Sequence, residues 1–204
     1  MAIRYGASAL GLVSEMPSGP GVITEEEISE IISRVPPPVA TFLLTSKLDP
    51  TLIISQQKKC GANTLQLCDY IELDAYPYLR NELPGVSLVQ VVHVTGEEAL
   101  WKALEVAPYV DAILLDSGNP NLTIKQLGGT GRAHDWSLSR KIREALPVPI
   151  FLAGGLNPHN VQEAMAQVQP FGLDICSGVR SHGVLDEIKL RVFMKKALGW
   201  EPEE

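Results

Sequence analysis

The chain has 204 residues, of which 45% are hydrophobic, so it is long enough to bury the core of a single domain covering residues 1–204. Its 24 acidic and 17 basic residues give a formal net charge of -7, and its Lys and Arg residues form no stripe with interleaved aromatic residues, so nucleic acid is not expected as a partner. No apolar run approaches the roughly 18 to 20 residues that span a bilayer, and no signal peptide precedes the first apolar run. We therefore expect a cytoplasmic protein with no membrane partner.

Short apolar runs alternate with helical patterns along almost the whole chain, which is typical of parallel strands covered by helices. The near-continuous apolar run at 112–115 suits a strand buried on both faces. Seven strands are predicted, at residues 7–13, 39–44, 64–67, 88–92, 112–115, 150–153 and 173–176.

Start signals place helices between these strands. Thr24 with Glu27, and Thr95 with Glu98, have the spacing of capping boxes. Asn157 followed by proline predicts an N-cap with proline at the first helical position. The three tryptophans lie in helical patterns, and we expect them to pack in the core: Trp101, Trp136 and Trp200.

Three cysteines occur in the chain: Cys60, Cys68 and Cys176. Their number is odd and their spacing is not that of metal ligands, so we expect reduced thiols. No metal and no cofactor are expected.

Two glycine-containing stretches near the end of the chain predict a ligand. Residues 151–158 and 172–179 each consist of an apolar run followed by glycines, which is how a backbone is shaped to hold a phosphate group. Two such units at the end of an alternating strand and helix pattern predict a (β/α)8 TIM barrel of the phosphate-binding type, with the phosphate in the loops after the last two strands. The expected partner is a phosphorylated small-molecule substrate. The alternative is that the glycines serve only tight turns between strands and helices.

Several segments, in order and with matching spacing, resemble the phosphoribosylanthranilate isomerase family of tryptophan biosynthesis. They are Leu-Leu-Asp-Ser at 114–117, Gly-Gly-Thr-Gly at 128–131 with Asp-Trp-Ser-Leu at 135–138, Ala-Gly-Gly-Leu-Asn-Pro-His-Asn-Val at 153–161, and Asp-Ile-Cys-Ser-Gly-Val at 174–179. Weaker similarity, including Gln66 and Leu67, extends back to about Tyr5.

The resemblance implies an Amadori rearrangement, in which an N-linked aldose phosphate becomes a ketose amine. This reaction needs an acid that protonates the ring oxygen and a base that removes a proton from the neighbouring carbon. The resemblance assigns the acid to Asp116, where burial at the barrel mouth would raise the carboxyl pKa. A lone aspartate that only caps a loop is the alternative.

The resemblance also implies the residues that bind substrate. Amides around Gly154, Gly155, Gly178 and Val179 would hold the phosphate, helped by the N-terminus of a short helix that begins near Val179. Arg180 either strengthens this anion site or points to solvent.

Further substrate contacts are expected at Gly128 and Gly129, in a loop that closes beside the substrate, and at Asp174, as a hydrogen-bonding group. His93 and His134 are titratable groups near strand ends or loops that we leave out of the mechanism.

Two departures from the family pattern bear on the mechanism. The family's base is a cysteine in a Lys-x-Cys-Gly segment on the first strand, and residues 1–204 contain no such segment. Three explanations are open: a gene start at an internal Met, true loss giving a homologue that binds without catalysis, or relocation of the base to Cys68.

Loop 14–21 also lacks the arginine that recognises the anthranilate carboxylate in the family. Backbone amides of residues 18–21 would then replace it, or the aromatic half of the ligand differs.

Two functions follow, an isomerase and a noncatalytic phosphosugar-binding homologue. The absent first strand would leave the first and last predicted strands, 7–13 and 173–176, with unpaired edges. We expect a chain that is poorly soluble, that forms a homo-oligomer through the open barrel edge, or that is completed by an upstream segment.

Overall fold

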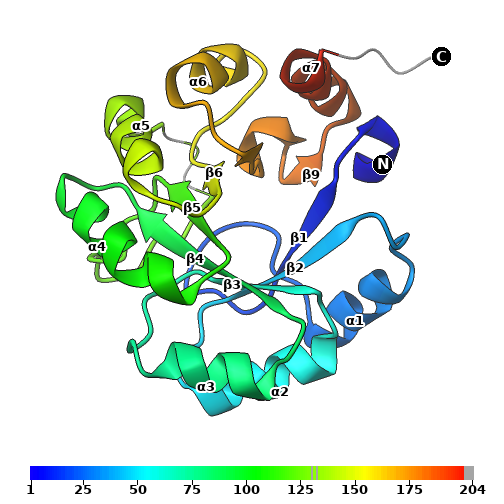
Figure 1. Cartoon of the computed structure of the whole chain (residues 1–204). Coiled ribbons are helices and arrows are strands. Elements are labelled where there is room, and N and C mark those ends of the chain that lie inside the picture. The colour runs from blue at the N-terminus through cyan, green and yellow to red at the C-terminus, as the bar shows by residue number, and fades with distance from the viewer. Residues whose placement is uncertain (130, 132, 200–204) are drawn as a thin grey trace.

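The computed structural model describes residues 1–129, 131 and 133–199, which form a curled parallel sheet with helices on its outer side (Figure 1). The sheet has 7 strands in the order β1-β2-β3-β4-β5-β6-β7, so each strand lies beside its predecessor in the chain. This is the TIM-barrel architecture that the sequence predicts. The strands are β1 (Ala9–Val13), β2 (Ala40–Thr45), β3 (Thr64–Leu67), β4 (Ser87–His93), β5 (Ala112–Asp116), β6 (Ile150–Leu152) and β7 (Gly172–Leu173).

Helices connect successive strands and cover the outside of the sheet. The described residues form no helix that is long and apolar enough to cross a membrane. A hairpin of β8 (Arg180–Ser181) and β9 (Val184–Leu185) precedes the last helix. The helices are η1 (Ala2–Tyr5), α1 (Glu25–Ser33), α2 (Pro50–Cys60), α3 (Ala75–Glu82), α4 (Glu98–Val106), η2 (Ala107–Tyr109), α5 (Trp136–Ala145), α6 (Val161–Val168), η3 (Ser177–Val179) and α7 (Glu187–Leu198).

All seven predicted strands are confirmed, but the last one is shorter than predicted. β7 contains only Gly172 and Leu173, and it pairs with β6 alone. In the described residues no ladder joins β7 to β1, so the chain supplies seven strands of an eight-stranded barrel. The prediction of strand over 173–176 is wrong beyond Leu173, because the parallel ladder ends there and Cys176 already precedes η3.

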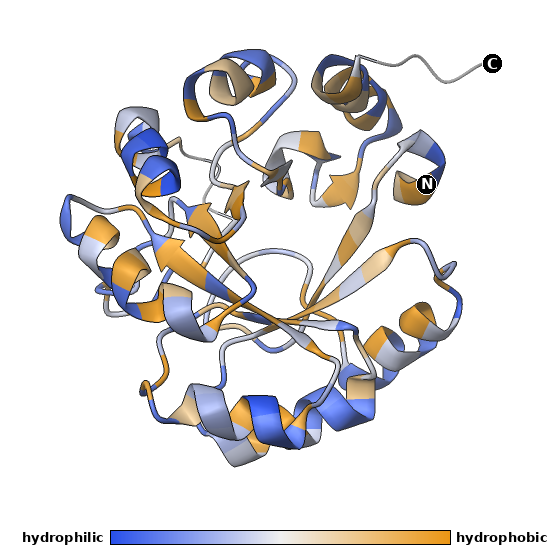
Figure 2. Ribbon diagram, viewed as in Figure 1, coloured by the Kyte–Doolittle hydropathy of each residue, from blue (hydrophilic) through white to orange (hydrophobic). Residues whose placement is uncertain are grey.

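Two apolar clusters lie on opposite faces of the sheet. On β4, Leu88 and Val92 belong to the cluster between sheet and helices, whereas Val89 and Val91 belong to a smaller cluster inside the barrel. This alternation follows from the two-residue period of a strand. Figure 2 shows apolar strands at the centre and mixed polar and apolar helices around them. Side chains at odd positions of β4 therefore face the interior.

One of the three predicted helix starts is confirmed. The hydroxyl of Thr24 accepts a hydrogen bond from the Glu27 amide at 3.2 Å, and the Glu27 carboxylate accepts one from the Thr24 amide at 2.8 Å. Thr95 is not the N-cap of α4, which is Glu97, although the Thr95 hydroxyl donates to the Glu98 carboxylate. Thr95 instead precedes a turn at the start of α4, in which the amide of Ala99 donates to the carbonyl of Gly96.

The prediction of a helix start at Asn157 is also wrong. α6 begins three residues after Pro158, with Asn160 as its N-cap. The side chain of Asn157 accepts from the His159 amide at 2.8 Å and so closes a local turn ahead of the helix.

The tryptophans differ in their environments. Trp101 is 70% exposed, so its predicted packing in the core is wrong. Trp136 packs against the outer cluster, as predicted. Trp200 lies outside the described residues.

The capping box of α1 allows a direct test of helix-end energetics. Thr24→Ala removes the two bonds of the Thr24 hydroxyl, one from the Glu27 amide and one to the Glu27 carboxylate, and should lower the free energy of unfolding by about 1 kcal/mol. Thr95→Ala removes only one bond at an exposed position outside the helix, and its effect should stay within about 0.5 kcal/mol. Urea unfolding of the two variants beside the unmodified protein measures both values. Equal destabilisation by the two substitutions would contradict this assignment of the caps.

Candidate active site

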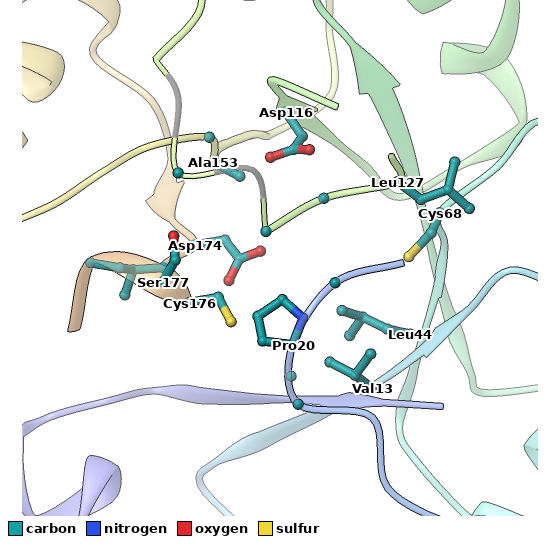
Figure 3. Close-up of a pocket in the computed structure, with 18 of the residues that line it drawn as sticks. Val13, Pro20, Leu44, Cys68, Asp116, Leu127, Ala153, Asp174, Cys176 and Ser177 are labelled. Carbon is teal, nitrogen blue, oxygen red and sulfur yellow. The ribbon is translucent and has the colours of Figure 1, made fainter. Parts of the chain in front are cut away.

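A pocket opens at the carboxyl ends of the parallel strands, where barrel enzymes hold their reacting groups (Figure 3). Its floor is formed by inward-facing side chains of the strands, and its walls by the loops that follow them. Carboxyl, thiol and guanidinium groups line it together with glycine-rich backbone. The chemically active lining residues are Cys68, Asp116, Asp174, Cys176, Ser177 and Arg180.

Asp116 is the last residue of β5, and the two-residue period of the strand turns its side chain toward the barrel interior. The side chain is only 7% exposed. Its Oδ2 atom accepts a hydrogen bond from the Gly118 amide at 2.9 Å. Burial nevertheless raises the carboxyl pKa, because water no longer stabilises the charged form. The structure thus places a carboxyl whose pKa is raised at the site where the sequence predicts an acid.

Asp174 follows β7 and lines the other side of the pocket. Burial, followed by the nearby charge of Asp116, raises the pKa of its carboxyl to about 6. Figure 3 shows both carboxyl groups directed into the pocket, that of Asp116 from β5 and that of Asp174 from the loop after β7. Two carboxyls that share one apolar space resist ionising together, so the pair is suited to exchanging protons with a ligand.

The predicted phosphate loops meet at this end of the barrel. Gly154 and Gly155 have left-handed backbones, with φ of 79° and 66°. A Cβ added to Gly178 would lie 1.9 Å from the carbonyl oxygen of Leu156, so the loop after β7 packs directly on the loop after β6. The two glycine loops predicted from sequence are therefore brought together at one site, and their backbones approach as closely as glycine alone permits.

The short helix predicted near Val179 begins two residues earlier. Ser177 begins the three-residue helix η3, Val179 ends it, and Arg180 begins the β8–β9 hairpin. The chain then turns back through His182 and Gly183, both with positive φ. The next helix, α7, begins only at Glu187.

Arg180 lines the pocket and reaches across to the loop after β1. One guanidinium nitrogen, Nη1, donates to the Gly183 carbonyl at 2.7 Å. The other, Nη2, lies where a Cβ on Gly21 would be only 3.4 Å away. Loop 14–21 has no cationic residue of its own, and Arg180 thus brings a positive charge beside it. The predicted alternative, in which Arg180 merely points to solvent, is not what the structure shows.

The loop after Asp116 crosses the pocket mouth and contacts the loop after β1. The Ser18 hydroxyl donates to the Lys125 carbonyl at 2.7 Å. The Lys125 ammonium group forms an ion pair with Asp69, a buried carboxylate after β3. Gly128 and Gly129 line the pocket, and both have positive φ. Thr130, part of the glycine motif predicted from sequence, lies outside the described residues.

The two cysteines of the pocket are poor bases. Cys68 is 2% exposed, and burial raises the pKa of its thiol far above the usual range. Burial also raises the pKa of Cys176. A base must be able to lose its proton near neutral pH, so the structure gives no support to relocation of the base to Cys68. Within the described residues, no group of three or more His, Cys, Asp or Glu side chains is arranged to hold a metal ion.

Two residues of the mouth were not given a role from the sequence. His93, at the end of β4, lies behind Asp116, with its Nδ1 atom 3.9 Å from the Asp116 Oδ2 atom. Asp69 holds the loop after β5 through Lys125. The inward position of His93 follows from the two-residue period of the run 88–92, whereas the pairing of Asp69 with Lys125 depends on how two distant loops fold.

Comparison with known proteins supports the resemblance found in the sequence. The family model described as N-(5'phosphoribosyl)anthranilate (PRA) isomerase matches residues 4–196. The N-(5'-phosphoribosyl)anthranilate isomerase of Methanosarcina acetivorans is 32% identical over 209 residues, which covers 96% of this chain and 86% of that relative. The protein of the same name from Haloferax volcanii is 37% identical over 194 residues, with coverage of 94% and 84%.

Solved structures show the same fold. Phosphoribosyl anthranilate isomerase from Thermotoga maritima superposes with a TM-score of 0.81 and 29% identity, covering 98% of this chain and 92% of its own. A phosphoribosyl anthranilate isomerase in complex with reduced 1-(o-carboxyphenylamino)-1-deoxyribulose 5-phosphate superposes with a TM-score of 0.79 and 27% identity, covering 98% and 91%. The chain belongs to the N-(5'-phosphoribosyl)anthranilate isomerase family.

Proposed function

We propose that this protein is a phosphoribosylanthranilate isomerase of tryptophan biosynthesis, which converts N-(5'-phosphoribosyl)anthranilate to the corresponding 1-deoxyribulose phosphate. The observation that carries this proposal is a buried carboxyl, Asp116, whose pKa is raised inside a pocket bordered by glycine-rich loops. A relative of the same fold binds a reduced carboxyphenylamino deoxyribulose phosphate, which supports a phosphorylated sugar amine as the ligand.

Asp116 is the general acid of this proposal. Its proton passes to the ring oxygen of the sugar while the bond from that oxygen to C1 breaks, and the nitrogen lone pair forms a Schiff base with C1. The C2 proton then passes to a general base, the role of the first-strand cysteine in the family, and leaves an enolamine that tautomerises to the ketose amine. Asp174 faces the same space, and we assign it hydrogen bonding to a sugar hydroxyl.

The two ends of the substrate require separate anion sites. We assign the phosphate to the backbone amides of Gly154, Gly155, Gly178 and Val179, because the close approach of the two loops leaves room for no side chain there. We assign the aromatic carboxylate to Arg180, whose guanidinium lies beside Gly21 in a loop that lacks a cation.

The loop that carries Gly128 and Gly129 covers the mouth in this proposal. Its contacts with the loop after β1 would exclude water from the Schiff base, which water hydrolyses. Both glycines line the pocket, and we assign them to contacts with the bound substrate.

We further propose that residues 1–204 act as one domain in the cytoplasm, and that the free edges of β1 and β7 pair with another segment or a second copy. One related solved structure, with 25% identity and a TM-score of 0.77, is of monomers generated from the dimeric Thermotoga maritima enzyme. That relative supports self-association as a property of the family's fold. Sedimentation of the purified chain tests this proposal, and a stable monomer with sharply cooperative unfolding would refute it.

Asp116→Asn tests the acid. Because an amide cannot donate a proton to the ring oxygen in this way, turnover of N-(5'-phosphoribosyl)anthranilate should fall at least about a hundredfold. Asp135→Asn is the matched control, since Asp135 only caps α5 and asparagine caps equally well. Near-normal turnover by Asp116→Asn would rule out the assigned acid. Ligand binding without turnover by the unmodified chain would indicate a noncatalytic homologue.

Gly178→Ala tests the phosphate site. The new Cβ would lie 1.9 Å from the Leu156 carbonyl oxygen, so the two loops must separate and the amides lose their arrangement. We expect loss of calorimetric binding of the reduced carboxyphenylamino deoxyribulose phosphate. Gly85→Ala is the control for general destabilisation, because its φ of +82° strains an alanine but nothing lies within 4 Å of its added Cβ. Unchanged affinity in Gly178→Ala would contradict the site.

Asp174→Asn tests the buried carboxyl through stability. The folded-state pKa of about 6 lies above the ordinary 3.8, so folding favours the protonated acid. This contribution is complete below the ordinary pKa and is lost as the pH rises through about 6. Relative to Asp174→Asn, the unmodified protein should lose on the order of 2 to 3 kcal/mol of unfolding free energy across that interval. Parallel pH profiles of the two proteins, measured by urea unfolding, would contradict the burial of this group.

A further inference from the structure

His93 and Asp116 are direct neighbours across the ladder between β4 and β5. The register pairs His93 with Asp116, and both side chains lie on the inner face of the sheet. The His93 side chain is 1% exposed and the Asp116 side chain 7%. The imidazole ring therefore fills the space behind the carboxyl, on the side away from the pocket.

The hydrogen bonds of His93 fix its tautomer. Its Nε2 atom lies 3.1 Å from the backbone carbonyl oxygen of Cys68, and a carbonyl oxygen can only accept. Nε2 must therefore carry the hydrogen. In the neutral ring Nδ1 is then free of hydrogen, and this buried atom has no hydrogen-bond partner. Burial lowers the pKa of His93, which favours this neutral form.

The loop after Asp116 encloses the pair. Gly118 lies against the ring so closely that an added Cβ would be 2.5 Å from the His93 Nδ1 atom and 2.4 Å from the Gln126 carbonyl oxygen. The Gly118 amide donates to the same carboxyl oxygen, Oδ2, that lies 3.9 Å from Nδ1. A shift of about 1 Å would bring these two atoms to hydrogen-bonding distance, and such contacts often tighten when a ligand binds.

Three charged groups on other elements also act on His93: Asp116 from β5, Asp69 from the loop after β3, and Lys102 from α4. Asp69 is paired with Lys125, and Lys102 lies over the ring of Tyr70, with its Nζ atom 5.0 Å from the centroid. Neither forms a hydrogen bond to Nδ1, because that atom has no partner. Asp116 therefore remains as the carboxyl that Nδ1 faces.

We infer that His93 is a positioning residue, whose hydrogen-free Nδ1 atom keeps the Asp116 carboxyl in the protonated form that donates to the sugar ring oxygen. At 3.9 Å the Nδ1 lone pair repels the charged carboxylate, which favours the acid form, and the single proton of that acid remains available to the sugar. This inference rests on the proposed function for the step that uses the proton. The protonation state itself can be measured without any turnover.

Infrared difference spectroscopy of the full chain without ligand tests the inference. The unmodified protein should show the band of a protonated carboxyl at neutral pH, and Asp116→Asn should lack it. In His93→Phe, which keeps a ring but removes the lone pair, the midpoint of this band should fall by about one pH unit. His134→Phe is the control, because His134 is partly buried and its pKa is lowered to about 4, but it bonds to Ser139. It should leave the midpoint unchanged.

Two results would overturn the inference: no protonated carboxyl in the unmodified protein, or an unchanged or higher midpoint in His93→Phe. If His93→Phe does not fold, nitrogen NMR of the unmodified protein decides, since hydrogen on Nδ1 instead of Nε2 would refute the assigned tautomer. Turnover gives a separate reading. In an active enzyme, the kcat of His93→Phe should be about tenfold lower than that of the unmodified protein at a pH above the carboxyl midpoints of both proteins, with little change in KM. Its kcat should recover as the pH falls. Inactivity of the unmodified chain would count against the isomerase function and leave the spectroscopic result intact.

Discussion

The proposed chemistry of this protein depends on removing a carboxyl group from water at the end of a parallel strand. A carboxyl in solution is ionised at neutral pH. The pKa of the Asp116 carboxyl is raised because the sheet surrounds it with apolar strands, and the buried ring of His93 lies beside it. The same burial acts on Asp174 on the opposite side. A parallel barrel provides this environment because the ends of its strands place side chains at one end of the barrel. The loops that follow the strands then determine how deeply these side chains are buried.

The glycine loops show a second use of close packing. Gly178 lies on the Leu156 carbonyl, and Gly154 lies on Ser117, the residue directly after the acid. Backbone from three successive loops is thus held close together, with the Ser117 side chain against Gly154. The direction of amide groups placed in this way is set by the strands rather than by flexible side chains. Under the proposed function, this is how an acidic chain would bind an anion with few cations in its pocket.

Most of the architecture could be predicted from sequence because parallel strands buried on both faces appear as isolated apolar runs. The strand ending at Asp116 is an example, and its inward direction follows from the period of two. Helix starts were less predictable. Thr24 and Thr95 have the same capping spacing, but only the first caps a helix, because the turn at Gly96 delays the second. The short last strand and the reach of Arg180 to Gly21 depend on partners far away in the chain, which local patterns do not describe. His93 lay in a predictable position, but its role depends on the bond from Nε2 to Cys68, which fixes the other nitrogen.

Lys125 joins three loops, through its side chain to Asp69 and through its carbonyl to Ser18. Movement of the loop after β5 away from the loop after β3 would have to break this partly buried ion pair, and the Asp69 carboxylate would remain almost enclosed by protein when its partner moves away. Such a separation is slow compared with proton transfer between fixed groups. Substitution at Lys125 would therefore change the rate of this loop movement and leave the Asp116 carboxyl untouched.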